Sequence, residues 1–177
     1  LYDDPDAVLA ATRAVNETLN EYVAALCDTG VDAVMLDTLF ASGSIMSKEM
    51  WARMEGGFVK ELADVIRQKN CLVMVHNCGK NVYFDVQIET MKPTAISFLY
   101  PPDDCKHFVE CKEKYGNIVT LIGCVSPPSV VIGTDEEWDE QCRSMIDAMA
   151  KGGGFILATG CEYPANASFD RAQRMID

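Results

Sequence analysis

The sequence predicts an α/β protein built on a parallel sheet, and two observations carry this prediction. Five short apolar segments alternate along the chain with longer segments whose apolar residues recur at helical spacing. The short segments are apolar throughout rather than at alternate positions, which is typical of strands in a parallel sheet covered on both faces. Periodicity alone does not separate a doubly wound sheet from part of a (β/α)8 barrel, because both read as alternating strands and helices.

The first half of the chain contains two helices with clear start signals. Asp4 and Pro5 suit the cap and the first position of a helix that continues to Gly30. Ser47 can cap a second helix with a continuous apolar face. The strands that follow these helices are predicted at 31–36 and 71–75.

The second half of the chain continues the alternation of strands and helices, and other residues mark the helix ends. Pro93 ends a shorter helix over 82–91, because proline cannot continue a helix. Thr134 and Glu137 form a capping-box pattern at the start of a later helix, which Gly152–Gly154 ends. The remaining strands are predicted at 95–100, 118–125 and 155–159, and the remaining helices at 104–115 and 168–177.

The composition indicates one globular domain over residues 1–177. Half of the residues, 49%, are apolar, so the chain can bury a sizeable core. The net charge of -12 disfavours contact with nucleic acid or anionic membranes, and no apolar run reaches the roughly 18 residues of a membrane helix. The eight cysteines form no Cys-x-x-Cys pair, and with nine methionines they fit a reducing cytoplasm, such as that of an anaerobe.

Reactive side chains gather at the C-terminal ends of the predicted strands, where parallel α/β proteins build their sites. Among them, His76, Cys78 and Cys161 supply one imidazole and two thiols, a donor set that suits zinc. Three protein ligands leave a fourth position open, as a catalytic zinc requires. The alternative is that Cys78 and Cys161 are buried thiols that pack as small hydrophobic residues.

Other side chains at these strand ends are candidates for catalysis or substrate binding. Asp37 can orient a substrate or a zinc ligand, although a role as a cap explains it as well. Glu162 can act as an acid or base or hydrogen-bond a ligand. Ser42 can help to receive an anion at the next helix start, with a plain connecting turn as the alternative. The further candidates for substrate contacts are Tyr100, Cys124 and Ser126.

Five stretches, spread over nearly the whole chain, carry a family resemblance. They are Asp37–Trp51, Val73–Gly79, Leu121–Pro127, Gly133–Glu137 and Gly152–Pro164. In these stretches the chain resembles the uroporphyrinogen decarboxylase superfamily, specifically its zinc-dependent corrinoid methyltransferase branch. The resemblance implies the C-terminal half of a (β/α)8 TIM barrel, with the N-terminal strands of that barrel absent from the chain.

The resemblance also implies a chemistry. In the methyltransferase branch a His-x-Cys pair and a later Cys bind zinc, which corresponds to His76, Cys78 and Cys161. The implied reaction moves a methyl group between a corrinoid (methylcobalamin), carried by a separate partner protein, and a small-molecule thiol or methyl ether. Zinc in such a site can lower the pKa of a substrate thiol or polarise the oxygen of a methyl ether, so both directions of transfer stay open.

Two departures and two alternative functions accompany this prediction. The chain has Cys124 and Ser126 where the family usually has Asn and Asp, and the loop after Cys161 lacks the usual Pro-rich continuation. One alternative is a metal-free uroporphyrinogen decarboxylase, although an acidic chain suits a substrate with many carboxylates poorly. The other is a non-catalytic half-barrel. Half a barrel has unpaired strand edges, so we expect a homo-oligomer or a pair with a separate N-terminal half.

Overall fold

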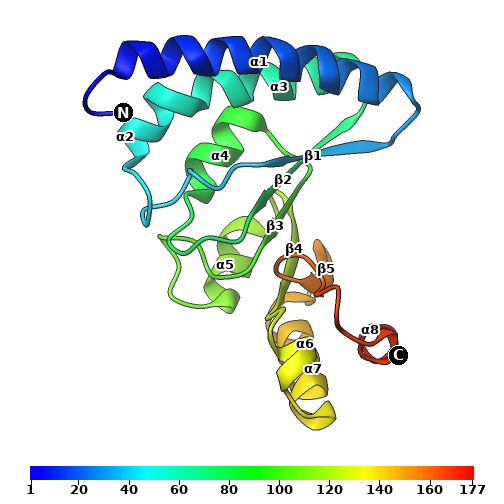
Figure 1. Cartoon of the computed structure of the whole chain (residues 1–177). Coiled ribbons are helices and arrows are strands. Elements are labelled where there is room, and N and C mark those ends of the chain that lie inside the picture. The colour runs from blue at the N-terminus through cyan, green and yellow to red at the C-terminus, as the bar shows by residue number, and fades with distance from the viewer.

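The computed structural model describes residues 1–177 and contains one parallel sheet in the order β1-β2-β3-β4-β5 (Figure 1). The strands are β1 (Ala33–Asp37), β2 (Leu72–Asn77), β3 (Ala95–Phe98), β4 (Thr120–Val125) and β5 (Phe155–Thr159). The helices are α1 (Pro5–Asp28), α2 (Lys48–Trp51), the π-helical turn η1 (Ala52–Gly56), α3 (Gly57–Gln68), α4 (Phe84–Met91), α5 (Phe108–Tyr115), α6 (Ser129–Ile132), α7 (Asp135–Met149) and α8 (Phe169–Ile176). The parallel α/β architecture predicted from the sequence is therefore confirmed.

The residues predicted to begin and end helices do so in the structure. The side chains of Asp4 and Ser47 each accept a hydrogen bond from a backbone amide in the first turn of α1 and α2. Thr134 and Glu137 make both bonds of the capping box, with donor–acceptor distances of 2.8 and 3.2 Å. Gly152–Gly154 forms the turn into β5 with positive φ at all three residues, a conformation that glycine adopts without strain.

Most predicted bounds agree with the structure to within two residues, and the larger differences are three. Helix α5 begins at Phe108 rather than at 104, because His107 lies in the cap position, where its Nδ1 accepts a hydrogen bond from the amide of Glu110. The second predicted helix is divided by η1 into α2 and α3. The short helix α6 follows β4 and was not anticipated, since four residues are too few to show helical periodicity.

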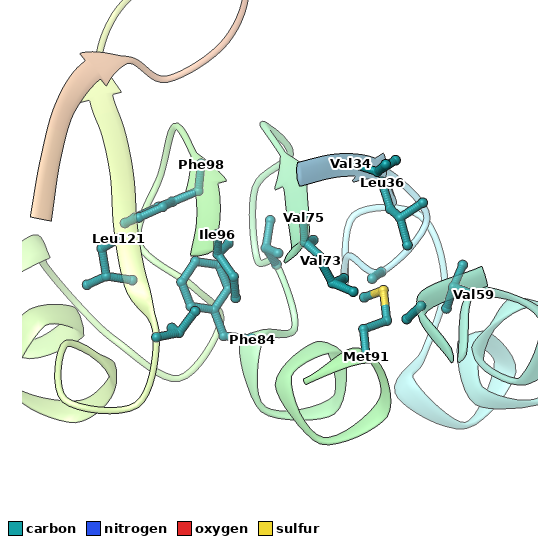
Figure 2. Close-up of a cluster of buried hydrophobic side chains, with 14 of the residues drawn as sticks. Val34, Leu36, Val59, Val73, Val75, Phe84, Met91, Ile96, Phe98 and Leu121 are labelled. Carbon is teal, nitrogen blue, oxygen red and sulfur yellow. The ribbon is translucent and has the colours of Figure 1, made fainter. Parts of the chain in front are cut away.

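One face of the sheet packs against the helices and forms the core. Figure 2 shows Val73, Val75 and Ile96 of the strands facing Phe84 and Met91 of α4, and all five side chains are buried. Helix α3 contacts β2, and α7 contacts β4 and β5. Burying such side chains stabilises the fold by roughly 2 kcal/mol each.

The opposite face of the sheet is open, which corrects the expectation of a sheet covered on both sides. Met35, Leu72 and Ile156 point to this face and are 47%, 50% and 52% exposed. Apolar strands indicate that both faces can be buried, but they do not say that the same chain supplies both covers. None of the helices combines the length and the apolar composition that a membrane span requires.

Candidate metal centre

The three predicted metal ligands converge although their strands are not neighbours. His76 lies at the end of β2 and Cys78 directly after it, whereas Cys161 follows β5. Two strands separate β2 from β5, so a flat sheet would hold them roughly 14 Å apart at about 4.8 Å per strand. One ligand atom from each residue nevertheless lies within 4.8 Å of the others. The sheet is therefore curved as in a barrel, and the curvature brings the strand ends together.

The imidazole of His76 is held by the neighbouring strand. Its Nδ1 lies 3.0 Å from Oγ of Ser97, which is paired in register with His76 on β3. This contact leaves Nε2 as the nitrogen available to a metal. A metal on Nε2 requires a proton on Nδ1, and the Ser97 hydroxyl can accept a hydrogen bond from it.

The loop that carries Cys78 is fixed from both sides by Asn77. The buried amide of Asn77 donates from Nδ2 to the carbonyl oxygen of Thr38 at 2.7 Å, and its Oδ1 accepts from the amide of Gly79 at 2.9 Å. A Cβ on Gly79 would lie only 3.0 Å from Oδ1 of Asn77, so glycine permits this tight loop. Cys78 is thus positioned between two anchored residues.

The chemistry of the donor set fits zinc. Partial burial raises the pKa of Cys78, because it disfavours the charged thiolate, and the adjacent Cys161 thiol adds to the effect, because two thiolates side by side would repel each other. Together they raise the pKa of Cys78 to about 11. A divalent cation between the two thiolates would offset this repulsion. One imidazole and two thiolates are the soft nitrogen and sulfur ligands that zinc prefers.

Zinc affinity is expected to rise with pH. Both thiols must lose a proton to bind the metal, and the raised pKa of Cys78 keeps it protonated at neutral pH. Raising the pH therefore removes a competing proton, and affinity should increase by up to about 100-fold per pH unit while two protons are released. Competition titrations with a chromophoric chelator between pH 6 and 8 measure this, after correction for the chelator's own protonation. A pH-independent affinity would show that the thiols are not the ligands.

Ser97→Ala is expected to weaken zinc binding about 10-fold to 100-fold, because the imidazole loses the partner that orients it. Ser97→Thr keeps the hydroxyl and should restore most of the affinity. The same chelator competition gives both values, and a shift in the His76 ring resonances would show the lost contact. Equal affinity in the alanine variant would contradict an orienting role.

A cavity of about 490 Å³ lies directly beside the three ligands. Its lining consists of Met35, Asp37, Leu39, His76, Cys78, Ser97, Cys161 and Glu162. Asp37 is paired in register with His76, and both predicted carboxylates reach the cavity. A substrate in this space would meet the open side of the metal ligands and two groups able to accept a proton.

The other four predicted site residues lie outside this cavity. Ser42 is fully buried, and its hydroxyl donates to the carbonyl oxygen of Lys80 in the loop after β2, so it supports the loop rather than facing a substrate. Cys124 is buried in the helix-covered core, which does not support the expected substrate contact. The centre of the Tyr100 ring lies 5.4 Å from Nζ of Lys80, and the carbonyl oxygen of Ser126 accepts a hydrogen bond from the hydroxyl of Ser129.

Sequence reasoning missed Ser97, Met35 and Leu39 as parts of the site. Met35 and Leu39 are ordinary apolar residues that carry no chemical signal. Ser97 does carry one, because it is a polar residue in the middle of the otherwise apolar strand β3. A hydroxyl in such a position needs a partner, and the nearest candidate on a neighbouring strand is the histidine.

The curved five-stranded sheet, with a zinc-type donor set at the C-terminal ends of its strands, defines one half of a (β/α)8 barrel with a candidate metal centre. The family model of uroporphyrinogen decarboxylase (URO-D) matches residues 1–177. The chain therefore belongs to the uroporphyrinogen decarboxylase family.

A solved structure, a methyltransferase from Methanosarcina mazei, has the same fold. It superimposes with a TM-score of 0.70 at 19% sequence identity, over 91% of this chain and 45% of that protein. The chain thus spans less than half the length of this neighbour, and at this identity the likeness shows the fold. Comparison with curated proteins gave no match.

Proposed function

We propose that the chain is the zinc-binding half of a methyltransferase that moves a methyl group between a corrinoid protein and a thiol or methyl-ether substrate. One observation carries this proposal: His76, Cys78 and Cys161 hold their ligand atoms within 4.8 Å of one another beside an open cavity. A structural zinc site would be closed by a fourth protein ligand, whereas this one faces space for a substrate. The methyltransferase fold of the solved neighbour supports the same class of reaction.

The residues around the cavity have separate tasks in this reaction. His76, Cys78 and Cys161 would hold the zinc, and Ser97 would keep the imidazole in its binding orientation. Bound zinc supplies Lewis acidity, which lowers the pKa of a substrate thiol or polarises an ether oxygen. For a thiol substrate, the proton must leave the cavity, and the carboxylates of Asp37 and Glu162 are placed to accept it.

The corrinoid is expected to arrive on a separate protein. The cavity opens at the C-terminal ends of the strands, so the partner would dock over this end of the half-barrel. All eight cysteines are free thiols, and a site built on two of them needs a reducing compartment. This supports a cytoplasmic reaction.

The test measures thiol-dependent loss of the methyl group from free methylcobalamin. The change in the visible absorbance of the corrinoid reports this loss. The zinc-loaded chain should accelerate transfer to 2-mercaptoethanol, and Cys161→Ser should remove the acceleration. Identification of the methyl thioether confirms the product. No acceleration by the zinc-loaded chain would contradict the proposal, and carboxyl loss from uroporphyrinogen without metal would favour the decarboxylase instead.

We further propose that a second polypeptide, either another copy or a separate N-terminal half, covers the open face of the sheet. Met35, Leu72 and Ile156 expose apolar surface there, and the strand edges of β1 and β5 are unpaired. We therefore expect the purified chain to self-associate. Light scattering should give a mass above 19.5 kDa, and a monomer at micromolar concentration would contradict this expectation.

A further inference from the structure

Close to the metal centre, the ends of two strands that do not pair with each other are in tight contact. Gly160 follows β5 and Leu99 follows β3, whereas β4 lies between these two strands in the sheet. Gly160 is buried, and a Cβ atom added to it would lie 2.6 Å from both Cα and Cδ1 of Leu99. Carbon atoms in contact are normally about 3.5–4.0 Å apart, so only a residue without a side chain fits at this position.

The end of β3 lies across β4 to make this contact. The ladder between β3 and β4 ends one residue before Gly123 of β4. A Cβ atom at Gly123 would overlap the carbonyl oxygen of Phe98, the last residue of β3. Two glycines, one on β4 and one after β5, therefore allow the end of β3 to reach β5, and the sheet curves at this point.

Gly160 directly precedes the metal ligand Cys161, and hydrogen bonds on both sides of it hold the chain in place. The amide of Gly160 donates to the carbonyl oxygen of Val125 at 2.8 Å, which continues the ladder between β4 and β5. The hydroxyl of Thr159 donates to the carbonyl oxygen of Cys161 at 2.6 Å. The direction in which Cys161 leaves the strand is therefore fixed by its two preceding residues.

A side chain at residue 160 would displace Cys161 by more than a metal site tolerates. Relief of an overlap at 2.6 Å takes a shift of about 1 Å, because Cα of Leu99 belongs to the backbone and cannot rotate away. Strand β3 is paired on both sides, whereas β5 lies at the edge of the sheet, so the residues after β5 give way. Zinc–ligand distances vary by only about 0.2 Å, which is much less than this shift.

We propose that Gly160 and Thr159 are positioning residues of the metal centre, which hold Cys161 within reach of a metal bound by His76 and Cys78. Neither residue is one of the three ligands, and neither lines the cavity beside them. This role rests on the zinc centre of the proposed function and not on the methyl transfer itself. It can therefore be measured by metal binding alone.

Titration of the chelator-treated chain with cobalt(II) tests this role, because cobalt occupies zinc-type sites and its bound thiolates give charge-transfer bands in the near ultraviolet. The wild type should show the bands of two thiolates. Gly160→Ala should lower the cobalt affinity about 100-fold or more and leave roughly half of the band intensity at saturation, because Cys78 remains as the single thiolate ligand. Thr159→Val should lower the affinity about 10-fold, as expected for a group that holds a ligand indirectly.

Three control variants separate positioning from a general loss of stability. Gly116→Ala introduces an equal overlap, at 2.6 Å from the carbonyl oxygen of Lys112, but before β4 and so at the opposite ends of the strands. Gly57→Ala adds a methyl group where no atom lies within 4 Å. Thr29→Val removes a hydroxyl-to-carbonyl bond of the same kind after α1. All three should keep the cobalt affinity and spectrum of the wild type.

The outcomes distinguish this role from the metal centre itself. Wild-type affinity and band intensity in a folded Gly160→Ala variant would overturn the positioning role and leave the centre in place. A wild-type chain without thiolate bands would overturn the centre and the role together. If circular dichroism shows that Gly160→Ala does not fold, Thr159→Val decides, and an unchanged affinity in that variant would overturn the proposal.

Discussion

Cys161→Ser is expected to reduce zinc from about one ion per chain to a trace after purification without added metal. The thiolate is one of three protein ligands, and the hydroxyl of serine is a far poorer ligand for zinc at neutral pH. If each ligand contributes about a third of a binding free energy near 10 kcal/mol, one loss lowers affinity roughly 300-fold or more. Cys78→Ser should have a similar effect. Metal analysis of the purified protein and a chelator competition measure both.

Matched controls are present in the same chain. Cys105→Ser changes a partly buried thiol outside the metal centre and should keep the zinc. His76→Gln should lose zinc, whereas His107→Asn changes the other histidine, retains a capping side chain for α5 and should keep the metal. Zinc retained in both Cys78→Ser and Cys161→Ser would show that the metal is bound elsewhere.

The fold could be predicted from the sequence where its signals are local. Asp4, Ser47 and Thr134 cap their helices as predicted, because a side chain and an amide three residues on decide the start of a helix. The curvature of the sheet and its open face are not local. In the sequence, Met35 looks like an ordinary buried strand residue. It is exposed in the structure because no helix of this chain packs on that face of the sheet. The sequence therefore predicts the strands but not the surface that covers them.

The candidate metal centre shows the same division. Parallel strands place His76, Cys78 and Cys161 at one end of the sheet, which made them candidates. Their distance from one another depends on the bend between β2 and β5, for which the sequence has no local signal.

Phe84→Ala is expected to lower the free energy of unfolding by about 3–5 kcal/mol. The ring of Phe84 is fully buried between α4 and the sheet (Figure 2), and it packs edge-to-face with Phe98 at a centroid distance of 5.0 Å and with Tyr115 at 5.4 Å. Truncation removes both aromatic contacts and leaves a cavity that the surrounding strands cannot close, because β3 and β4 are fixed by their ladder bonds. Urea unfolding followed by circular dichroism measures the loss.

Two comparisons separate this cavity effect from a general loss of aromatic surface. Phe169→Ala, at a residue that is 89% exposed, should change the unfolding free energy by less than about 0.5 kcal/mol. Phe84→Leu should recover a large part of the stability, because leucine refills most of the volume without restoring the edge contacts. If Phe84→Ala cost no more than Phe169→Ala, the packing of α4 against the sheet would have to be looser than the structure shows. The remaining deficit of Phe84→Leu then measures what the two ring contacts add beyond filling the space.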